Sequence, residues 1–352
     1  MSIAETQIIL GNSSKKFSGI TSTMLQVLRY QKNYAHVAVL GANYVPTDTH
    51  VLGYRQFLKL TKSPLTNGEW RVFHARRNDE MIQALTAKIL FGSKIKIVFT
   101  STAQRQHSAF TRWLMSKMDA IISTSPTAAE FVQDCRVDRI IPHGIDIGKY
   151  KPAKSKFEAW QALGLPGSQG IGIFGRVRYS KGIDILVDAA IPILRRDPEV
   201  TVVICGECLP KDQIYKNQIQ SKINNAGLSD QFVFLGKQPF SRLPSIFQSM
   251  TVVAALSRNE GFGLTPLEAM ASGCAVITSE AGAWKDIIDS GHNGYCVPIG
   301  DAAAVTEKLE ILISNKMTRD AMAVVAREHV IKHYTVEKEA QNITQFLLSL
   351  CR

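Results

Sequence analysis

The chain has 352 residues, of which 45% are hydrophobic and 20% are charged. This composition excludes a disordered or fibrous protein, and the length suits two globular domains. Residues 1–150 carry 19 Lys and Arg against 10 Asp and Glu, whereas residues 151–352 carry 22 against 20. The basic half is therefore expected to contact an anionic partner: nucleic acid, an acidic membrane and a charged substrate are the open alternatives.

The sequence predicts a cytoplasmic protein. No apolar run approaches the roughly 20 residues that cross a bilayer, and the first residues lack a basic segment followed by an apolar one. The six cysteines agree with this location. Cys205 and Cys208 form a lone C-x-x-C without a second pair, so we expect thiols and no metal site.

Short β-branched or apolar runs alternate with helical patterns along the chain, which is typical of α/β architecture with parallel sheets. In the first half we expect strands at residues 7–10, 37–40, 71–74, 95–100, 120–123 and 139–141. In the second half we expect them at residues 170–174, 200–205, 232–235, 251–255 and 275–278. Helical patterns lie between the strands, for example at residues 183–196 and 301–314.

The chain is expected to divide near the segment P-H-G-I-D at residues 142–146, because a polar stretch follows and a new strand series then begins. We predict two doubly wound domains, with the last helix, residues 335–352, returning to the first domain. Ligands of such sheets bind beyond the carboxyl ends of the strands, so two facing domains would share a cleft.

The strongest chemical signal is E-G-F-G-L-T-P-L-E at residues 260–268, directly after an expected strand. Thr265 suits the N-cap of a helix and Pro266 its first position. Glycines in the loop let backbone amides approach a ligand, and the start of a helix favours a phosphate. Glu260 and Glu268 would flank this anion and accept hydrogen bonds from sugar hydroxyls. Glu268 also has a structural alternative, because T-x-x-E is a capping box.

A second signal is G-R-V-R-Y-S-K-G at residues 175–182, between an expected strand and a helix. Arg176 and Lys181 bracket this loop, and Gly175 permits close backbone approach. Two cations beside a diphosphate would neutralise the charge that grows as a sugar–phosphate bond breaks. A solvated basic turn is the alternative for this loop alone, but its combination with the glutamate loop favours a diphosphate site.

The patterns G-R-x4-K-G and E-x7-E, in this order, resemble family 4 of the retaining glycosyltransferases, which have the GT-B fold. The resemblance covers nearly the whole chain, including K-F-S-G at residues 16–19 and the segment at residues 142–146. It implies two Rossmann-like domains facing across a cleft. Residues 1–146 with the last helix would bind the acceptor, and residues 147–334 would bind the nucleotide-sugar donor.

The resemblance also implies roles for single residues. Arg176 and Lys181 would hold the donor diphosphate, Glu260 would contact the donor sugar and Glu268 the ribose. The glycine and backbone positions that would lie close to the donor are Gly19, Gly175, Gly261, Phe262, Gly263 and Leu264. The implied reaction needs no metal or other cofactor, since the nucleotide sugar is a co-substrate.

Within this family, the first half is most similar to the mannosyltransferases of lipopolysaccharide core assembly in alpha-proteobacteria, on residues 16–23, 73–81 and 99–108. These enzymes transfer mannose from GDP-mannose to a Kdo sugar. The similarity therefore implies an anionic glycolipid acceptor and a peripheral, electrostatic association with the inner membrane. Arg76 and Arg77 would contact acceptor carboxylates or phosphates, because a guanidinium pairs both oxygens.

The sequence departs from the family pattern at two places. Many relatives have a histidine where the strand here ends in Thr100, and the nearby candidates are His74 and His107. We assign His74 to catalysis, because it lies in a dense polar string at a strand's end, and keep His107 as an acceptor-binding candidate. Relatives often read P-N-G at the domain boundary, where this chain has His143.

Other interpretations stay open. A UDP-sugar donor for another envelope glycan, or a subunit that only binds nucleotide sugar, would use the same loops. A dehydrogenase is disfavoured because residues 12–19 lack G-x-G-x-x-G, and nucleic-acid binding because no reader module is present.

One predicted helix carries a stripe of large apolar residues: Phe110, Trp113, Leu114 and Met118. Such a stripe favours a face packed against the core, with membrane docking as the alternative.

Overall fold

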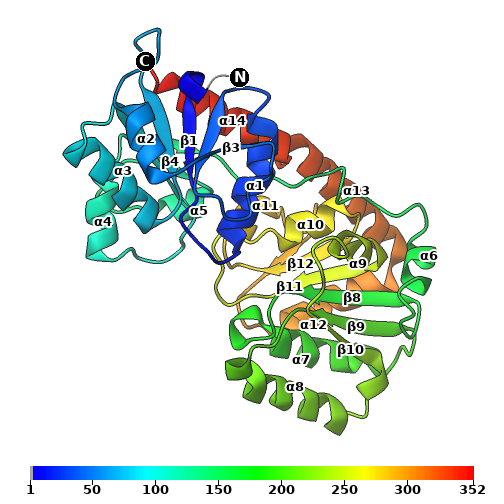
Figure 1. Ribbon diagram of the computed structural model, residues 1–352. Helices are drawn as coiled ribbons and strands as arrows, with labels where there is room; N and C mark the ends of the chain where they lie inside the picture. Colours follow the sequence, from blue (N-terminus) through cyan, green and yellow to red (C-terminus); the bar gives the residue numbers. More distant parts are fainter. Residues whose placement is uncertain (1–2) are drawn as a thin grey trace. The chain divides into compact units, whose positions relative to one another are not determined.

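A computed structural model describes residues 3–352, which form two compact units (Figure 1). The first unit comprises the chain up to Gly144 together with Val336–Arg352, and the second is Ile145–Thr335. Each unit contains one parallel sheet with helices packed on both of its faces. The predicted α/β class with parallel sheets is therefore confirmed.

The first unit has a seven-stranded sheet in the order β3-β2-β1-β4-β5-β6-β7. Its strands are β1 (Ile8–Gly11), β2 (Val37–Leu40), β3 (His50–Leu52), β4 (Arg71–Ala75), β5 (Ile95–Ser101), β6 (Ala120–Ser123) and β7 (Arg139–Ile140). Its helices are α1 (Gly19–Gln31), α2 (Tyr54–Thr61), α3 (Asn78–Leu90), α4 (Ala109–Met115), α5 (Pro126–Ala129) and α14 (Val336–Ser349). The order reverses between β1 and β4, so the first unit has the switch point at which doubly wound sheets bind ligands.

Apolar side chains on the two faces of this sheet form two separate cores. One core packs the strands against α1 and α14, through residues such as Val27 and Ile343. The other packs them against α2, α3 and α4, through residues such as Phe57 and Met81. Figure 1 shows α14, in red, beside α1, although more than 300 residues of sequence separate the two helices.

His143, the departure from P-N-G, attaches the end of the first unit's main segment to the last helix. Its Nδ1 lies 2.7 Å from Oε1 of Glu339 on α14, and both residues are buried. The Gly144 N–H donates to the other carboxylate oxygen at 2.8 Å. One carboxylate of the last helix therefore holds two consecutive residues at the unit boundary.

The second unit has a six-stranded sheet in the order β10-β9-β8-β11-β12-β13. Its strands are β8 (Gln169–Phe174), β9 (Val200–Cys205), β10 (Phe232–Gly236), β11 (Val252–Ala255), β12 (Ala275–Ser279) and β13 (Tyr295–Val297). Its helices are α6 (Lys156–Gln161), α7 (Ile183–Leu194), α8 (Gln213–Asn225), α9 (Leu243–Ser249), α10 (Thr265–Ala271), α11 (Trp284–Ile287), α12 (Ala302–Ser314) and α13 (Lys316–His333). The order reverses between β8 and β11, which places the two loops singled out in the sequence beside each other.

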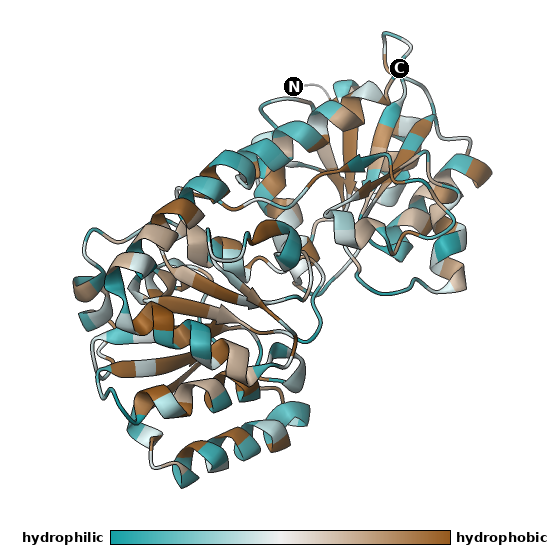
Figure 2. Cartoon of the chain, turned by 180° about the vertical axis from the view of Figure 1, so that it is seen from behind, coloured by the Kyte–Doolittle hydropathy of each residue, from teal (hydrophilic) through white to brown (hydrophobic). Residues whose placement is uncertain are grey.

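The strands are mainly hydrophobic in both sheets, and the outer faces of the helices are largely hydrophilic (Figure 2). This pattern is expected for parallel sheets that are covered on both faces. Every strand predicted from the sequence is present, with bounds that differ by at most one residue. Two strands were not predicted, β3 and β13. Both lie at sheet edges and have only three residues, too few for a recognisable apolar run.

The apolar stripe on α4 is divided between core and solvent. Leu114 is buried, but Phe110 and Trp113 are 53% and 54% exposed, and their rings stack on each other. The expectation of a fully packed face is therefore wrong for these two aromatic residues. Over residues 3–352, no helix is both long and apolar enough to cross a bilayer.

Candidate active site

The loop after β8 is held close to the sheet by a glycine. At Gly182, φ is +67°, and a Cβ there would come within 2.0 Å of the Leu256 carbonyl oxygen. Only glycine fits this approach without displacing backbone. The contact brings the short helical turn Tyr179–Lys181 against the end of β11. The two loops that the sequence singled out are thus in direct contact.

Lys181 and Glu260 form an ion pair between these two loops. Their side chains are 17% and 20% exposed, so the pair is accessible but mostly removed from water. The Ser257 hydroxyl donates to the same carboxylate oxygen of Glu260 at 3.2 Å. Arg176 is exposed, and its guanidinium pairs with no carboxylate in the described part of the chain. The site therefore presents one neutralised cation and one that can accept an anion.

The glycine-rich loop after β11 is shaped by Trp284. The indole Nε1 of this buried residue donates to the Gly263 carbonyl at 2.9 Å. Gly263 has φ of +78°, and a Cβ there would meet both Trp284 Nε1 and the Cγ of Glu260. Substituting Gly263 would thus displace either the indole or the glutamate.

Glu268 is engaged by Tyr150 and does not cap the helix. The buried Tyr150 hydroxyl donates to Glu268 Oε1 at 2.9 Å, and burial raises the pKa of Glu268. Leu264 is already in a helical conformation and is the N-cap residue, without a side-chain bond. The prediction of Thr265 as the N-cap is therefore wrong, because Leu264 holds that position and α10 begins at Thr265. The capping-box alternative for Glu268 is not formed either. Within residues 3–352, the Tyr150 hydroxyl is the one hydrogen-bond partner of this carboxylate, so its other oxygen can accept a further hydrogen bond.

Arg258 ties both loops to α7. Its two terminal nitrogens donate to the two oxygens of Asp184, at 2.9 and 2.7 Å, and its guanidinium lies 3.7 Å from the centre of the Tyr179 ring. The Tyr215 hydroxyl donates to the same carboxylate at 2.8 Å. These contacts hold the pKa of Asp184 below its usual range, although its partial burial acts in the opposite direction. Arg258 thereby fixes the loop of Lys181 relative to the loop of Glu260.

In the first unit, Glu80 organises the predicted acceptor loop. Its Oε2 accepts from the Arg76 N–H at 2.7 Å, and its Oε1 accepts from the Arg77 guanidinium at 2.9 Å. The other terminal nitrogen of Arg77 donates to Ser18, the N-cap of α1, at 3.0 Å and to Thr21 at 2.9 Å. The Arg77 guanidinium is therefore hydrogen-bonded within this unit. The sequence had predicted a contact with the acceptor and did not predict these internal bonds.

Arg76 differs from its neighbour. Its Nη1 is buried and has no hydrogen-bond partner within residues 3–352. Burial lowers the pKa of the Arg76 guanidinium, whereas the nearby carboxylates of Glu80 and Glu339 act in the opposite direction. A buried donor without a partner is uncommon and marks a place where a ligand oxygen can be accommodated. Of the two arginines, Arg76 is thus the better placed to contact an anion.

Both candidate histidines contact the end of β5. His74 Nε2 lies 2.7 Å from the Thr100 hydroxyl, and His107 Nε2 lies 3.1 Å from the Ser101 hydroxyl. His74 is fully buried, and its Nδ1 has no partner among the described residues. His74 can therefore position Thr100, whereas its predicted catalytic role stays a prediction. Gly19 opens α1, and a Cβ there would meet no atom within 4 Å.

Burial of His74 predicts a loss of stability in mild acid. Burial and the charge of Arg76 lower the pKa of the imidazole well below its ordinary value. The unfolded chain takes up this proton near pH 6.5 and the folded chain resists it, so stability is present above about pH 6.5 and falls as the pH drops below it. We expect His74→Gln to reduce the fall in melting temperature between about pH 7.5 and 5.5. The control is His50→Gln, at an exposed histidine in β3; equal pH dependence in both variants would contradict the prediction.

Comparisons with known proteins identify the family of the chain. Residues 160–329 match the family described as "Glycosyl transferases group 1". The lipopolysaccharide core biosynthesis mannosyltransferase LpcC of Rhizobium leguminosarum bv. viciae is 37% identical, over 97% of this chain and 96% of its own length. The lipopolysaccharide core biosynthesis mannosyltransferase LpsB of Rhizobium meliloti is 32% identical, over 99% of both chains.

A solved structure supports the fold. Anabaena Alr3699/HepE, determined in complex with UDP and glucose, is similar over 98% of this chain and all of its own, with a TM-score of 0.80 and 20% identity. At this identity the similarity concerns the fold alone.

The fold and the two loops thus define a glycosyltransferase of the GT-B class. The chain belongs to the group 1 glycosyl transferases, the retaining family 4, and its similarity to LpcC and LpsB spans nearly its full length. The resemblance inferred from the sequence motifs is confirmed.

Several residues of the candidate site were not identified from the sequence. They are Glu80, Tyr150, Asp184, Tyr215, Ser257, Arg258 and Trp284. Arg258 and Ser257 lie within three residues of Glu260, and Asp184 lies three residues after Lys181. Their short sequence distance from Glu260 and Lys181 could have indicated that these three residues belong to the site. Tyr150 and Trp284 carried no such signal, because only tertiary contacts bring them to the loops.

Proposed function

We propose that this glycosyltransferase transfers mannose from GDP-mannose to the Kdo-containing inner core of a lipopolysaccharide precursor. The observation that carries the proposal is the similarity to LpcC and LpsB over nearly the whole chain. The second unit would bind the nucleotide sugar and the first the acceptor, in keeping with the basic charge of residues 1–150. The UDP complex of Alr3699/HepE supports a nucleotide site in this fold without identifying the base.

The proposed mechanism is a front-side displacement. The acceptor hydroxyl forms its bond to the anomeric carbon on the face from which the diphosphate departs, and its proton passes to the departing phosphate oxygen. Arg176 and Lys181 would stabilise the negative charge that develops on the diphosphate. Glu260 would orient a hydroxyl of the donor sugar, and the free oxygen of Glu268 would bind the ribose. These two side-chain cations would supply the positive charge, so we expect nucleotide binding to persist in a chelator.

The proposal is tested by incubating the purified protein with Kdo–lipid A and labelled GDP-mannose, with UDP-glucose and UDP-galactose in parallel. Transfer of mannose from GDP-mannose supports it. Preference for a UDP-sugar would leave the glycosyltransferase assignment intact and remove the mannosyl assignment. Binding of every donor without transfer to any acceptor would favour a subunit that only binds nucleotide sugars.

Arg258 is expected to be a positioning residue in this reaction. Arg258→Gln removes both bonds to Asp184 and so weakens the attachment of the Lys181 loop to the Glu260 loop. We expect kcat/KM for the donor to fall about tenfold or more, since small displacements of bound groups slow transfer strongly. Arg196→Gln is a matched control, because it removes an exposed ion pair between Arg196, two residues after α7, and Glu310 of α12. An equal loss in the control, or a loss explained by unfolding, would count against the role.

We further propose that the protein associates peripherally with the cytoplasmic face of the inner membrane. Support comes from the excess of basic residues in residues 1–150 and from the exposed, stacked pair Phe110 and Trp113. Aromatic rings of this kind are favoured at the interface between lipid and water.

Sedimentation with acidic liposomes should weaken strongly with salt, because exposed charges are screened over about 8 Å at physiological ionic strength. The variant F110S/W113S should lower the binding that remains at high salt. Phe157→Ser, at an exposed phenylalanine of the second unit, should not. Binding that is insensitive to both salt and the double substitution would contradict the proposal.

A further inference from the structure

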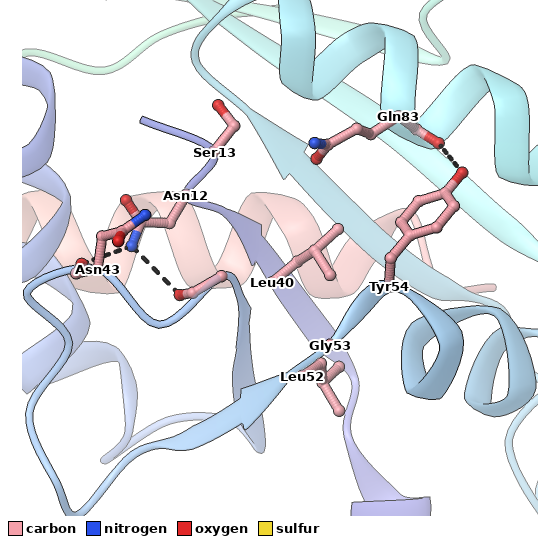
Figure 3. A pocket seen from close by; sticks show the side chains of 9 residues that line it. Asn12, Ser13, Leu40, Asn43, Leu52, Gly53, Tyr54 and Gln83 are labelled. Atoms are coloured by element: carbon pink, nitrogen blue, oxygen red, sulfur yellow. Dashed lines mark hydrogen bonds between the residues drawn. The ribbon is translucent and has the colours of Figure 1, made fainter. Parts of the chain in front are cut away.

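The first unit contains a pocket that none of the roles assigned above uses. It has a volume of about 460 Å³ and lies where β1, β2 and β3 end, between these strands and Gln83 of α3 (Figure 3). This volume is within the range of small-molecule sites. Because the carboxyl ends of parallel strands are where doubly wound folds bind ligands, the position is that of a binding site.

Two side-chain amides present unused oxygen atoms at this pocket. Asn12 is fully buried, and its Nδ2 donates to the carbonyls of Gly41 at 3.3 Å and Asn43 at 2.8 Å. These two bonds fix the amide, and its Oδ1 is buried without a partner in the described chain. The Oε1 of Gln83 is likewise buried and unpartnered within residues 3–352, and the side chain extends from α3 toward Ser13 (Figure 3). Buried acceptor oxygens that lack a hydrogen-bond partner are suited to a ligand that donates hydrogen bonds.

The remaining walls are apolar or already hydrogen-bonded. Leu40 and Leu52 are buried at the strand ends and line the pocket. The Tyr54 hydroxyl donates to the Gln83 backbone carbonyl at 3.1 Å, which leaves its ring as an apolar wall. All of the residues that line the pocket are uncharged. The pocket thus combines hydrogen-bond acceptors with apolar surface and has no side chain to neutralise an anion.

A neutral pyranose ring has this complementary chemistry, because its hydroxyls donate hydrogen bonds and its C–H groups pack on apolar surface. We propose that the pocket binds an uncharged, hexose-sized sugar unit of the acceptor, separate from the anionic group expected at Arg76. The two places are connected through Glu80, which accepts from the Ser13 hydroxyl at 3.4 Å and from the Arg76 N–H at 2.7 Å. This inference rests on the proposed function, in that the substrate is a glycan acceptor, and adds that this acceptor carries an uncharged sugar beside its charged one.

The test measures binding of simple glycosides to the full-length protein, without donor or lipid. Methyl α-mannoside and methyl α-glucoside serve as neutral probes and free Kdo as an anionic one, detected by saturation-transfer NMR. Gln83→Met keeps the length of the side chain and removes its amide. We expect it to weaken binding of at least one neutral glycoside about tenfold, as expected for the loss of a hydrogen bond to a buried acceptor. Gln218→Met, on exposed α8, is the matched control and should leave binding unchanged.

The thermal melting curve of each variant, followed by circular dichroism, shows whether the protein is folded, and Gln83→Ala replaces Gln83→Met if the latter is not. The inference is overturned if neither neutral glycoside binds, if both bind the wild type and the Gln83 variants equally, or if only Kdo binding depends on Gln83. These outcomes test the sugar pocket and do not depend on whether the protein transfers mannose. Failure of mannose transfer with intact, Gln83-dependent glycoside binding would remove the mannosyltransferase assignment and leave the sugar site standing.

Discussion

Glu260→Gln should lower kcat by about 10²-fold or more while leaving the Kd for a nucleoside diphosphate within a few-fold of wild type. The substitution keeps the size of the side chain but removes the charge that pairs with Lys181. Lys181 then becomes free to contact phosphate oxygens, so nucleotide binding has no reason to weaken. Turnover falls because the carboxylate that orients the donor sugar is lost. Steady-state transfer rates and calorimetric titration with GDP measure the two quantities.

The control for this variant is Glu307→Gln, an exposed glutamate of α12 whose side chain pairs with the adjacent Lys308. It should retain full activity and stability. Equal, small losses of binding and turnover for Glu260→Gln would show that Glu260 is a structural carboxylate. The assignment of Glu260 to the donor sugar would then have to be abandoned.

Lys181→Met should damage both donor binding and turnover, with a loss in kcat/KM of about 10²-fold or more. The substitution removes a cation from the proposed diphosphate site. It also removes the cation beside the Glu260 carboxylate, which keeps its hydrogen bond from the Ser257 hydroxyl. The uncompensated charge would then repel the anionic donor, so the loss combines a missing attraction with a new repulsion.

A double-mutant cycle separates these two effects. If repulsion contributes, nucleotide binding by the variant K181M/E260Q should be stronger than binding by Lys181→Met alone. Calorimetry with GDP, in the presence of a chelator, provides the affinities. Additive losses in the cycle would show that the Lys181–Glu260 pair has no influence on the donor site. Nucleotide binding by the wild type only with added magnesium or manganese would contradict the assignment of the charge to Arg176 and Lys181.

Much of the fold could be predicted because parallel strands buried on both faces leave long apolar runs in the sequence. Residues 37–40, 120–123 and 200–205 were predicted as strands with the bounds that the structure shows. The edge strand β3 was not, since two of its three residues are exposed and carry no apolar pattern. Edge strands obtain their conformation from hydrogen bonds to a neighbour, which a local pattern does not record.

The site residues likewise divide into those that the sequence predicted correctly and those that it did not. The Lys181 and Glu260 loops were recognisable because glycines and charged residues follow buried strands at fixed spacing, and the structure pairs the two charges. Arg77 is a residue type that often binds anionic ligands. In the structure, however, its guanidinium is hydrogen-bonded to Glu80 and to Ser18 at the start of α1. Thr265 is a residue type that is common at N-caps, but α10 begins at Thr265 and its N-cap is Leu264. Local chemistry does not indicate which partner a polar side chain finds.

The sequence by itself determined the family, the α/β class and the two charged loops of the second unit, since each follows from residue types at short, fixed spacing. Only the tertiary structure decided that Glu268 binds Tyr150, that Arg258 joins the two loops through Asp184, and that Asn12 and Gln83 share a pocket. The sequence separation is 118 positions for Glu268 and Tyr150, 74 for Arg258 and Asp184, and 71 for Asn12 and Gln83. Contacts of this range form when the chain folds back to bury its apolar surface, and nothing local in the sequence encodes them.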